Sequence, residues 1–184
     1  MEQLKGLRQM ESTLSLVSDH VSVLSSRLEA LVFRAQRIAH AMKDGRQEPD
    51  MMFGYDLQNF RRDVRTFGNE IGGLGTTLGS ISRAAQYDEE SVAHAQSVMR
   101  VCDRLQRALA ALRDQSQLAH QHIRQAEHKM EAWYLGQEIE ALVHQNQGLH
   151  TIANKIVIVV STKPGAPPAA PPPSAPPPDA GRRP

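Results

Sequence analysis

A repeat of apolar residues over the first 42 positions constrains the fold of this chain more than any other feature of its sequence. The apolar positions alternate steps of three and four residues, the heptad spacing of helices that pack side by side. They are Leu7, Met10, Leu14, Val17, Val21, Leu24, Leu28, Leu31, Ala35, Ile38 and Met42. Gly45 follows and suits a helix C-terminus, because glycine readily adopts a left-handed conformation. The repeat predicts a coiled-coil-type helix within residues 1–46.

The same spacing returns after a short connection. Asp50 can cap a second helix, and the connection over residues 45–50 is short enough to make the two helices an antiparallel hairpin. The second set of apolar positions comprises Phe53, Leu57, Phe60, Val64, Phe67, Ile71, Leu74, Leu78, Ile81 and Ala85. This set predicts a second helix over residues 50–86.

A third apolar repeat begins after Asp88, whose carboxylate suits a helix N-cap. Its members are Ala95, Val98, Cys102, Leu105, Leu109, Leu112, Ser116, Ala119, Ile123, Ala126, Met130 and Trp133. Neither glycine nor proline separates it from the second repeat, so whether those two helices are continuous stays open. We predict a long helix over residues 88–160, with a shift of apolar phase near 133–136. Residues 89–133 then complete a three-helix bundle, and 136–160 form an extension that folds back or pairs with another chain.

Proline marks the end of the helical part. All of the chain's 11 prolines except Pro49 lie in residues 164–184. That segment has almost nothing to bury, so we predict a disordered Pro-rich tail with polyproline II character. Its PxxP spacings, such as Pro164 to Pro167, match the ligands of SH3- or WW-type domains weakly. A solvated spacer is the alternative interpretation.

Composition supports a helical protein and excludes few functions. Aromatic residues make up only 4% of the chain, so the core should consist of aliphatic residues and methionine. A net charge of +1 gives no general attraction to nucleic acid or anionic membranes. The longest apolar run, residues 156–160, is far shorter than the roughly 20 residues of a membrane span, and no signal-peptide pattern opens the sequence. We expect a cytoplasmic protein; whether residues 155–160 form helix or strand stays open.

The least ordinary residues are four glycines beside the second apolar repeat. Gly68, Gly72, Gly75 and Gly79 also follow steps of four, three and four. Each glycine inside a helix costs about 1 kcal/mol relative to alanine, so the row needs an explanation. Close packing of a neighbouring helix and a hinge near residues 72–73 are the two predictions, and a ligand groove is a third possibility.

The sequence contains no recognisable catalytic or metal-binding motif. We find no Walker loop, nucleophile elbow, dinucleotide fingerprint or zinc cluster. His120 and His122 cluster with His128, but the first two would face different sides of a helix. Cys102 is the lone cysteine, and its place in the third repeat predicts a small buried side chain. We therefore predict a protein that is not an enzyme and holds neither a cofactor nor a metal ion.

The functional prediction rests on apolar surface that a three-helix bundle would leave uncovered. The extension at 136–160 has no obvious partner in a three-helix bundle, so its apolar residues should bind another chain. The predicted partner-binding residues are Trp133, Tyr134, Leu135, Leu142, Leu149, Ile152 and Ile156. We predict a coiled-coil structural or adaptor subunit that acts through homo- or hetero-oligomerisation or partner binding.

Two other functions stay open. The arginines at 61, 62 and 65, and those at 100, 104 and 107, allow a helical protein that binds nucleic acid, although interhelical ion pairs or a solvated face are the favoured explanation. A chaperone or secreted helical hairpin of an export system would instead form a one-to-one complex with a different protein.

Overall fold

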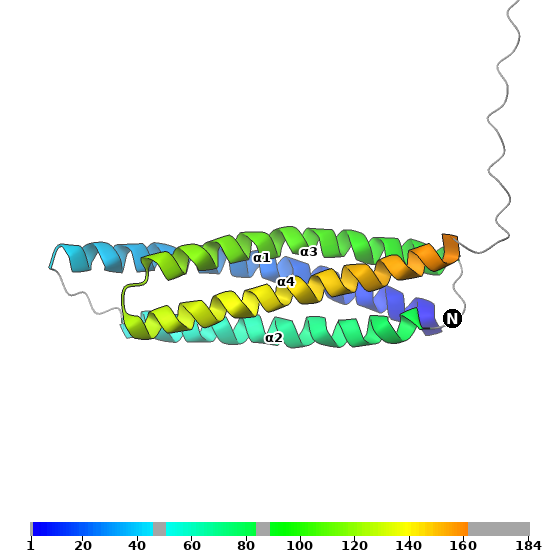
Figure 1. Ribbon diagram of the computed structural model, residues 1–184, viewed down its shortest axis with the longest axis horizontal. Coiled ribbons are helices and arrows are strands. Elements are labelled where there is room, and N and C mark those ends of the chain that lie inside the picture. Colours follow the sequence, from blue (N-terminus) through cyan, green and yellow to red (C-terminus); the bar gives the residue numbers. More distant parts are fainter. Residues whose placement is uncertain (1, 46–50, 84–88, 162–184) are drawn as a thin grey trace, which may run out of the picture.

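Four long helices lie side by side in a rod (Figure 1) in the computed structural model, which describes residues 2–45, 51–83 and 89–161. They are α1 (Glu2–Lys43), α2 (Met51–Ser82), α3 (Glu89–His122) and α4 (Ala126–Ser161). No strand occurs in these three ranges. The prediction of an all-α helical bundle is therefore confirmed. The predicted disordered tail over 164–184 lies outside the described residues, as does the predicted cap Asp50.

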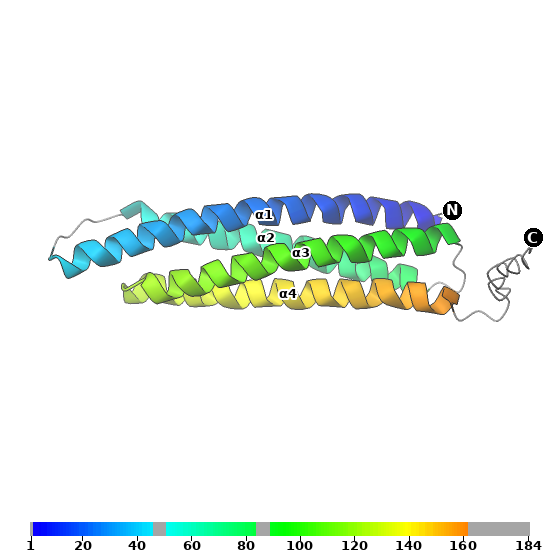
Figure 2. The same cartoon turned by 90° about the horizontal axis from the view of Figure 1, so that it is seen from above.

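Each helix packs against two others, and the order around the bundle is α1, α3, α4, α2 (Figures 1 and 2). α1 runs parallel to α3, since Arg8 pairs with Glu90 and Glu11 accepts a hydrogen bond from Ser97 near the start of both helices. α2 is antiparallel to α1, and α4 is antiparallel to α3. Because of the order of the helices around the bundle, the α1–α2 side of the rod lies opposite the α3–α4 side.

The predicted apolar repeats of α1, α2 and α3 form most of the core. In α1 the repeat is buried from Leu7 to Ala35. Ile38 is only half-buried and Met42 is exposed, because the C-terminal end of α1 projects beyond the other helices (Figure 2). Gly45 has a φ of 69°, the left-handed conformation predicted for the end of this helix.

The prediction of a single helix over 88–160 is wrong. The chain reverses at residues 123–125, so that α3 ends at His122 and α4 begins at Ala126. A four-helix bundle thus replaces the predicted three helices with an extension. The second and third helices are also separate, because α2 ends at Ser82 and α3 begins at Glu89.

A coincidence of spacing explains the error. Met130 and Trp133 continue the three-and-four rhythm of α3, yet both are exposed on α4. The buried repeat of α4 has a phase of its own and consists of Ala132, Leu135, Ile139, Leu142, Asn146, Leu149, Ala153 and Ile156. Reversing the chain lets α2 and α3 cover this repeat, which a straight continuation of α3 would leave in water.

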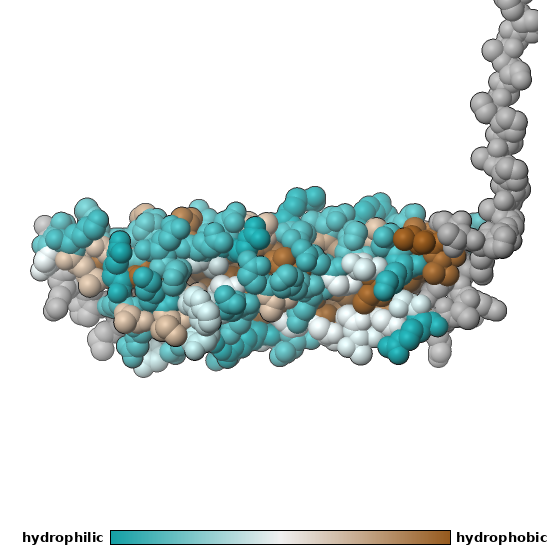
Figure 3. Space-filling model, viewed as in Figure 1, coloured by the Kyte–Doolittle hydropathy of each residue, from teal (hydrophilic) through white to brown (hydrophobic). Residues whose placement is uncertain are grey.

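The β-branched run at the end of α4 is helical up to Ser161. Ile156 is buried there, whereas Ile158 and Val159 are exposed. Figure 3 shows hydrophobic surface at this end of the rod. The question of helix or strand over residues 155–160 is therefore answered in favour of helix. None of the described helices is long and apolar enough to cross a membrane.

Candidate docking surfaces

Most of the residues predicted to bind a partner are instead buried within the chain. Leu135, Leu142, Leu149 and Ile156 have at most 1% of their surface exposed, and Ile152 packs against the same core. Their prediction as an interface is wrong for the folded bundle. The fourth helix, which the sequence prediction treated as an extension without a partner, is covered by α2 and α3.

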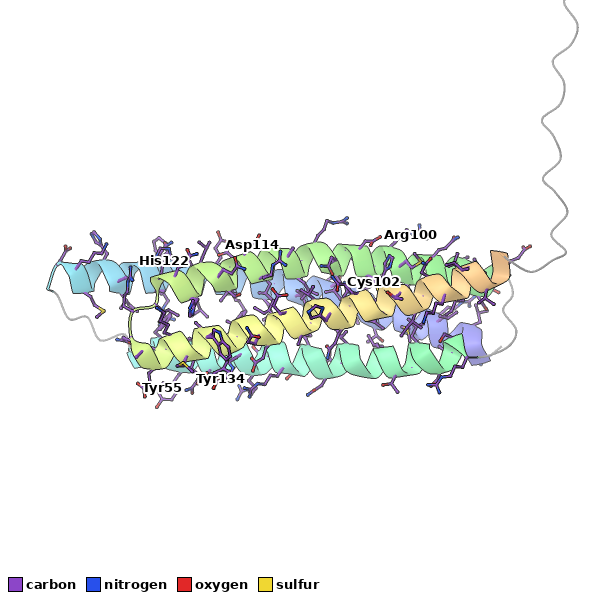
Figure 4. All side chains as sticks on the ribbon, in the orientation of Figure 1. Tyr55, Arg100, Cys102, Asp114, His122 and Tyr134 are labelled. Atoms are coloured by element: carbon purple, nitrogen blue, oxygen red, sulfur yellow. The ribbon has the colours of Figure 1, made fainter. Side chains whose placement is uncertain are left out.

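Trp133 and Tyr134 are the two predicted partner-binding residues that stay exposed, at 47% and 42% of their surface. Their rings meet edge to face, with centroids 5.1 Å apart. Tyr134 lies on the side of α4 that faces α2, where the Arg61 guanidinium stacks 4.8 Å from the centre of its ring (Figure 4). Trp133 lies on the opposite flank and lines a hollow between α3 and α4.

An ion-pair cluster joins α2 to α4. Arg61 donates to both carboxylate oxygens of Glu138 at 2.9–3.0 Å and also pairs with Glu131, while Arg65 donates to Glu138 at 2.7 Å. The hydrogen bonds from Arg61 to Glu138 raise the pKa of its guanidinium. Two arginines of the first predicted patch are thus engaged within the chain. In the second patch, Arg104 donates to the hydroxyls of Ser15 and Ser18 on α1.

The glycine row of α2 faces α4 only in part. A Cβ added at Gly68, Gly72 or Gly75 would lie 3.4–3.9 Å from side chains of α4, which is ordinary van der Waals contact. At Gly79 it would meet nothing within 4 Å. α2 is also continuous through residues 72–73. The row therefore shows neither a break in the helix nor an approach too close for alanine. Among the described glycines the closest contact would be at Gly54, where a Cβ would lie 2.6 Å from Cε1 of His128.

The described residues contain no group of three or more histidine, cysteine or acidic side chains able to hold a metal ion. His122 lies instead against α1, with Nε2 3.2 Å from the Gln36 amide nitrogen. Cys102 is buried near the middle of the rod (Figure 4), as its place in the third repeat predicts. Burial raises the pKa of its thiol to about 12.

The α1–α2 side is the most open edge of the bundle. α1 and α2 approach each other less closely than any other neighbouring pair. Two adjoining hollows of about 300 and 240 Å³ lie between them, on either side of Arg27. Leu24, Leu31, Phe60 and Phe67 line the hollows with apolar surface. We call this surface the α1–α2 face.

Exposed apolar residues of α1 border the α1–α2 face. Val23 lines one hollow and is 59% exposed. Leu16 lies one heptad earlier on the same side of α1 and is 58% exposed. Phe67 and Leu74 of α2 are only partly buried although they belong to the second apolar repeat. The exposed apolar residues at the edge of the hollows and the apolar residues that line the hollows form one surface.

The charges of the α1–α2 face are sorted by helix. α1 contributes basic groups, and α2 contributes acidic groups: Arg27 pairs with Asp63 at 2.9 Å, and Arg34 pairs with Asp56 at 2.5 Å. His20 of α1 lies 5.8 Å from the ring of Phe67. Each edge of the face therefore carries one sign of charge.

Sequence reasoning missed Leu16 and Val23. Both fall outside the three-and-four repeat, and an isolated exposed apolar residue is common on protein surfaces. The available signal was their spacing: Leu16, Val23 and Ala30 recur every seven residues, a second and narrower apolar line on the same helix. No protein family, curated protein or solved structure with which the chain was compared matches it.

Proposed function

We propose that this protein is a non-enzymatic structural subunit that assembles with a second copy of itself through the α1–α2 face. The observation that carries the proposal is the open seam of that face, where Leu16 and Val23 are exposed beside a hollow lined by the partly buried Phe67. Burying apolar surface is the main driving force of association. The remaining sides of the rod are more closely packed.

The sorted charges favour a second copy as the occupant. Two identical faces meet around a two-fold axis. If residue i of one copy contacts residue j of the other, residue j of the first copy also contacts residue i of the second. If the axis runs along the rod, basic α1 of one copy lies opposite acidic α2 of the other, at the same height along the bundle. If the axis crosses the rod, α1 faces α1 and like charges oppose. Complementary charge therefore predicts the axis along the rod.

The charged groups of the α1–α2 face can form further hydrogen bonds while they keep their ion pairs within the chain. Arg27 bonds to Asp63 through Nη1, and half of its side-chain surface is exposed. A guanidinium has five N–H donors, so Arg27 can bind a second carboxylate while it keeps the first. The α1–α2 face thus offers both apolar contact and hydrogen bonds to another copy.

Light scattering after gel filtration of the full chain tests the proposal. We expect a mass of twice 20.4 kDa at micromolar concentration. Val23→Glu should shift the protein towards the monomer, because it places a carboxylate in apolar surface and opposite the acidic edge of α2. The dissociation constant should rise about tenfold or more, a loss of at least ~1.4 kcal/mol.

Phe33→Glu is the matched control. Phe33 is even more exposed than Val23 on the same helix, but it lines neither hollow. Its substitution should leave the mass unchanged. A wild-type chain that stays monomeric at several hundred micromolar, or equal effects of the two substitutions, would rule out assembly through this face.

A further inference from the structure

A second hollow lies on the opposite side of the rod, between α3 and α4. It measures about 280 Å³ and lies near the turn that joins the two helices. Small residues from both helices form its base. Ser116 of α3 and Ala132 of α4 are both buried at its base, and Gly136 completes the floor. We call it the α3–α4 groove.

The walls of the α3–α4 groove combine one aromatic ring with several hydrogen-bond donors. Trp133 forms part of one wall and is half-exposed. Arg113 and Gln117 come from α3, and Gln137 comes from α4. The Nε of Arg113 has no hydrogen-bond partner among the described residues, since its nearest carboxylate oxygens, from Asp114 and Glu140, are each 3.9 Å away.

An extended proline-rich segment has the chemistry that this groove can bind. Proline rings pack against aromatic side chains, and a polyproline II helix makes no internal hydrogen bonds, so its carbonyl groups remain free to accept. The indole N–H, the guanidinium and the glutamine amides are all donors. The groove carries these donors beside the Glu140 carboxylate, so it offers Trp133 as packing surface for prolines and N–H groups for their carbonyls.

We propose that the α3–α4 groove binds the proline-dense stretch 171–178 of the same chain. The distance that the chain can span beyond Ser161 supports this assignment. Trp133 precedes Ser161 by about 28 residues, or roughly 42 Å along α4 at ~1.5 Å per residue. At ~3.1 Å per residue of polyproline II, positions 171–178 can lie about 31 to 53 Å from Ser161. The prolines are therefore densest at the distance of the groove.

The single tryptophan of the chain provides the readout. In the full-length protein, docking should shield Trp133 from the quencher acrylamide. Replacing the six prolines of 171–178 by serine should raise the Stern–Volmer quenching constant about twofold. The matched control replaces Pro164, Pro167 and Pro168, which extend at most about 22 Å beyond Ser161 and cannot reach the groove. This control should quench like wild type.

The substitution Arg113→Ala provides an independent test of the groove. It should increase quenching in the wild-type background and have no further effect once the six prolines are gone. Identical quenching of wild type and the six-proline variant would overturn the proposal. So would shielding that appears only as protein concentration rises, because that result assigns the stretch to the groove of another copy. Neither result bears on assembly through the α1–α2 face, which lies on the opposite side of the rod.

Discussion

Asn146 places a polar side chain at a buried position in the repeat of α4. Its Nδ2 donates to the backbone oxygen of Cys102 at 2.9 Å and to Oε1 of Gln106 at 3.1 Å. Its Oδ1 has no hydrogen-bond partner among the described residues. A shift of α4 along α3 would leave the buried donor unpaired as well, at a cost of about 1–3 kcal/mol. Asn146 therefore fixes the register of the two helices at some expense of stability.

Cys102, beside this contact, should be inert in the folded protein. The thiolate is the reactive form of cysteine, and desolvation of the thiol, followed by the charge of Asp103, raises its pKa to about 12. We expect a thiol reagent such as 5,5′-dithiobis(2-nitrobenzoate) to label it at pH 8 about 100-fold more slowly than free cysteine. Labelling at the rate of free cysteine would show that α3 and α4 separate readily.

The raised pKa of Cys102 also has a consequence for stability. The unfolded thiol ionises near its ordinary pKa of 9.0, before the folded one does. Its contribution to stability is therefore complete below pH 9.0 and is lost as pH rises towards 12. Cys102→Ala should weaken the decline of the urea midpoint over that range. An identical decline in the variant would assign the loss to other groups.

At the scale of the helix, α2 contains glycine that its packing does not require. A Cβ at Gly79 would contact nothing, so Gly79→Ala should raise the free energy of unfolding by about 1 kcal/mol, the difference in helix propensity. Urea denaturation of the full chain measures this change. Gly54→Ala is the informative contrast, since its Cβ would press on His128 and should offset that gain. A loss of stability at Gly79 would mean that α2 has a partner there.

The ends of the helices show which parts of the fold the sequence can predict. The end of α1 was predictable, because Gly45 supplies the left-handed conformation that a helix C-terminus favours. The turn between α3 and α4 was not, because residues 123–125 are Ile-Arg-Gln and include no helix breaker. Its cause is the burial of the α4 repeat by helices distant in sequence, which no local signal records.

At the scale of the whole molecule, heptad spacing predicted which residues of α1 to α3 would be buried but not which helices would be neighbours. Leu135 and Leu142 were recognised as apolar positions that need a cover, yet the sequence offered no way to see that α2 and α3 supply it. The surface that stays open is set by the spacing between α1 and α2. That spacing emerges only when all four helices are packed.

A disulfide-trapping experiment tests the assembly of two copies through the α1–α2 face most directly. Val23 and Thr66 line the same hollow from α1 and α2, and both are exposed. With the two-fold axis along the rod, residue 23 of one copy lies opposite residue 66 of the other. Cys102 is buried, so cysteines introduced at these positions should react selectively.

Full-length V23C and T66C proteins are mixed and oxidised mildly, then separated without reductant. We predict a disulfide-linked heterodimer in the V23C–T66C mixture, and little in V23C mixed with F33C, whose cysteine lies outside the face. A yield for V23C–T66C no greater than that for V23C–F33C would contradict the account.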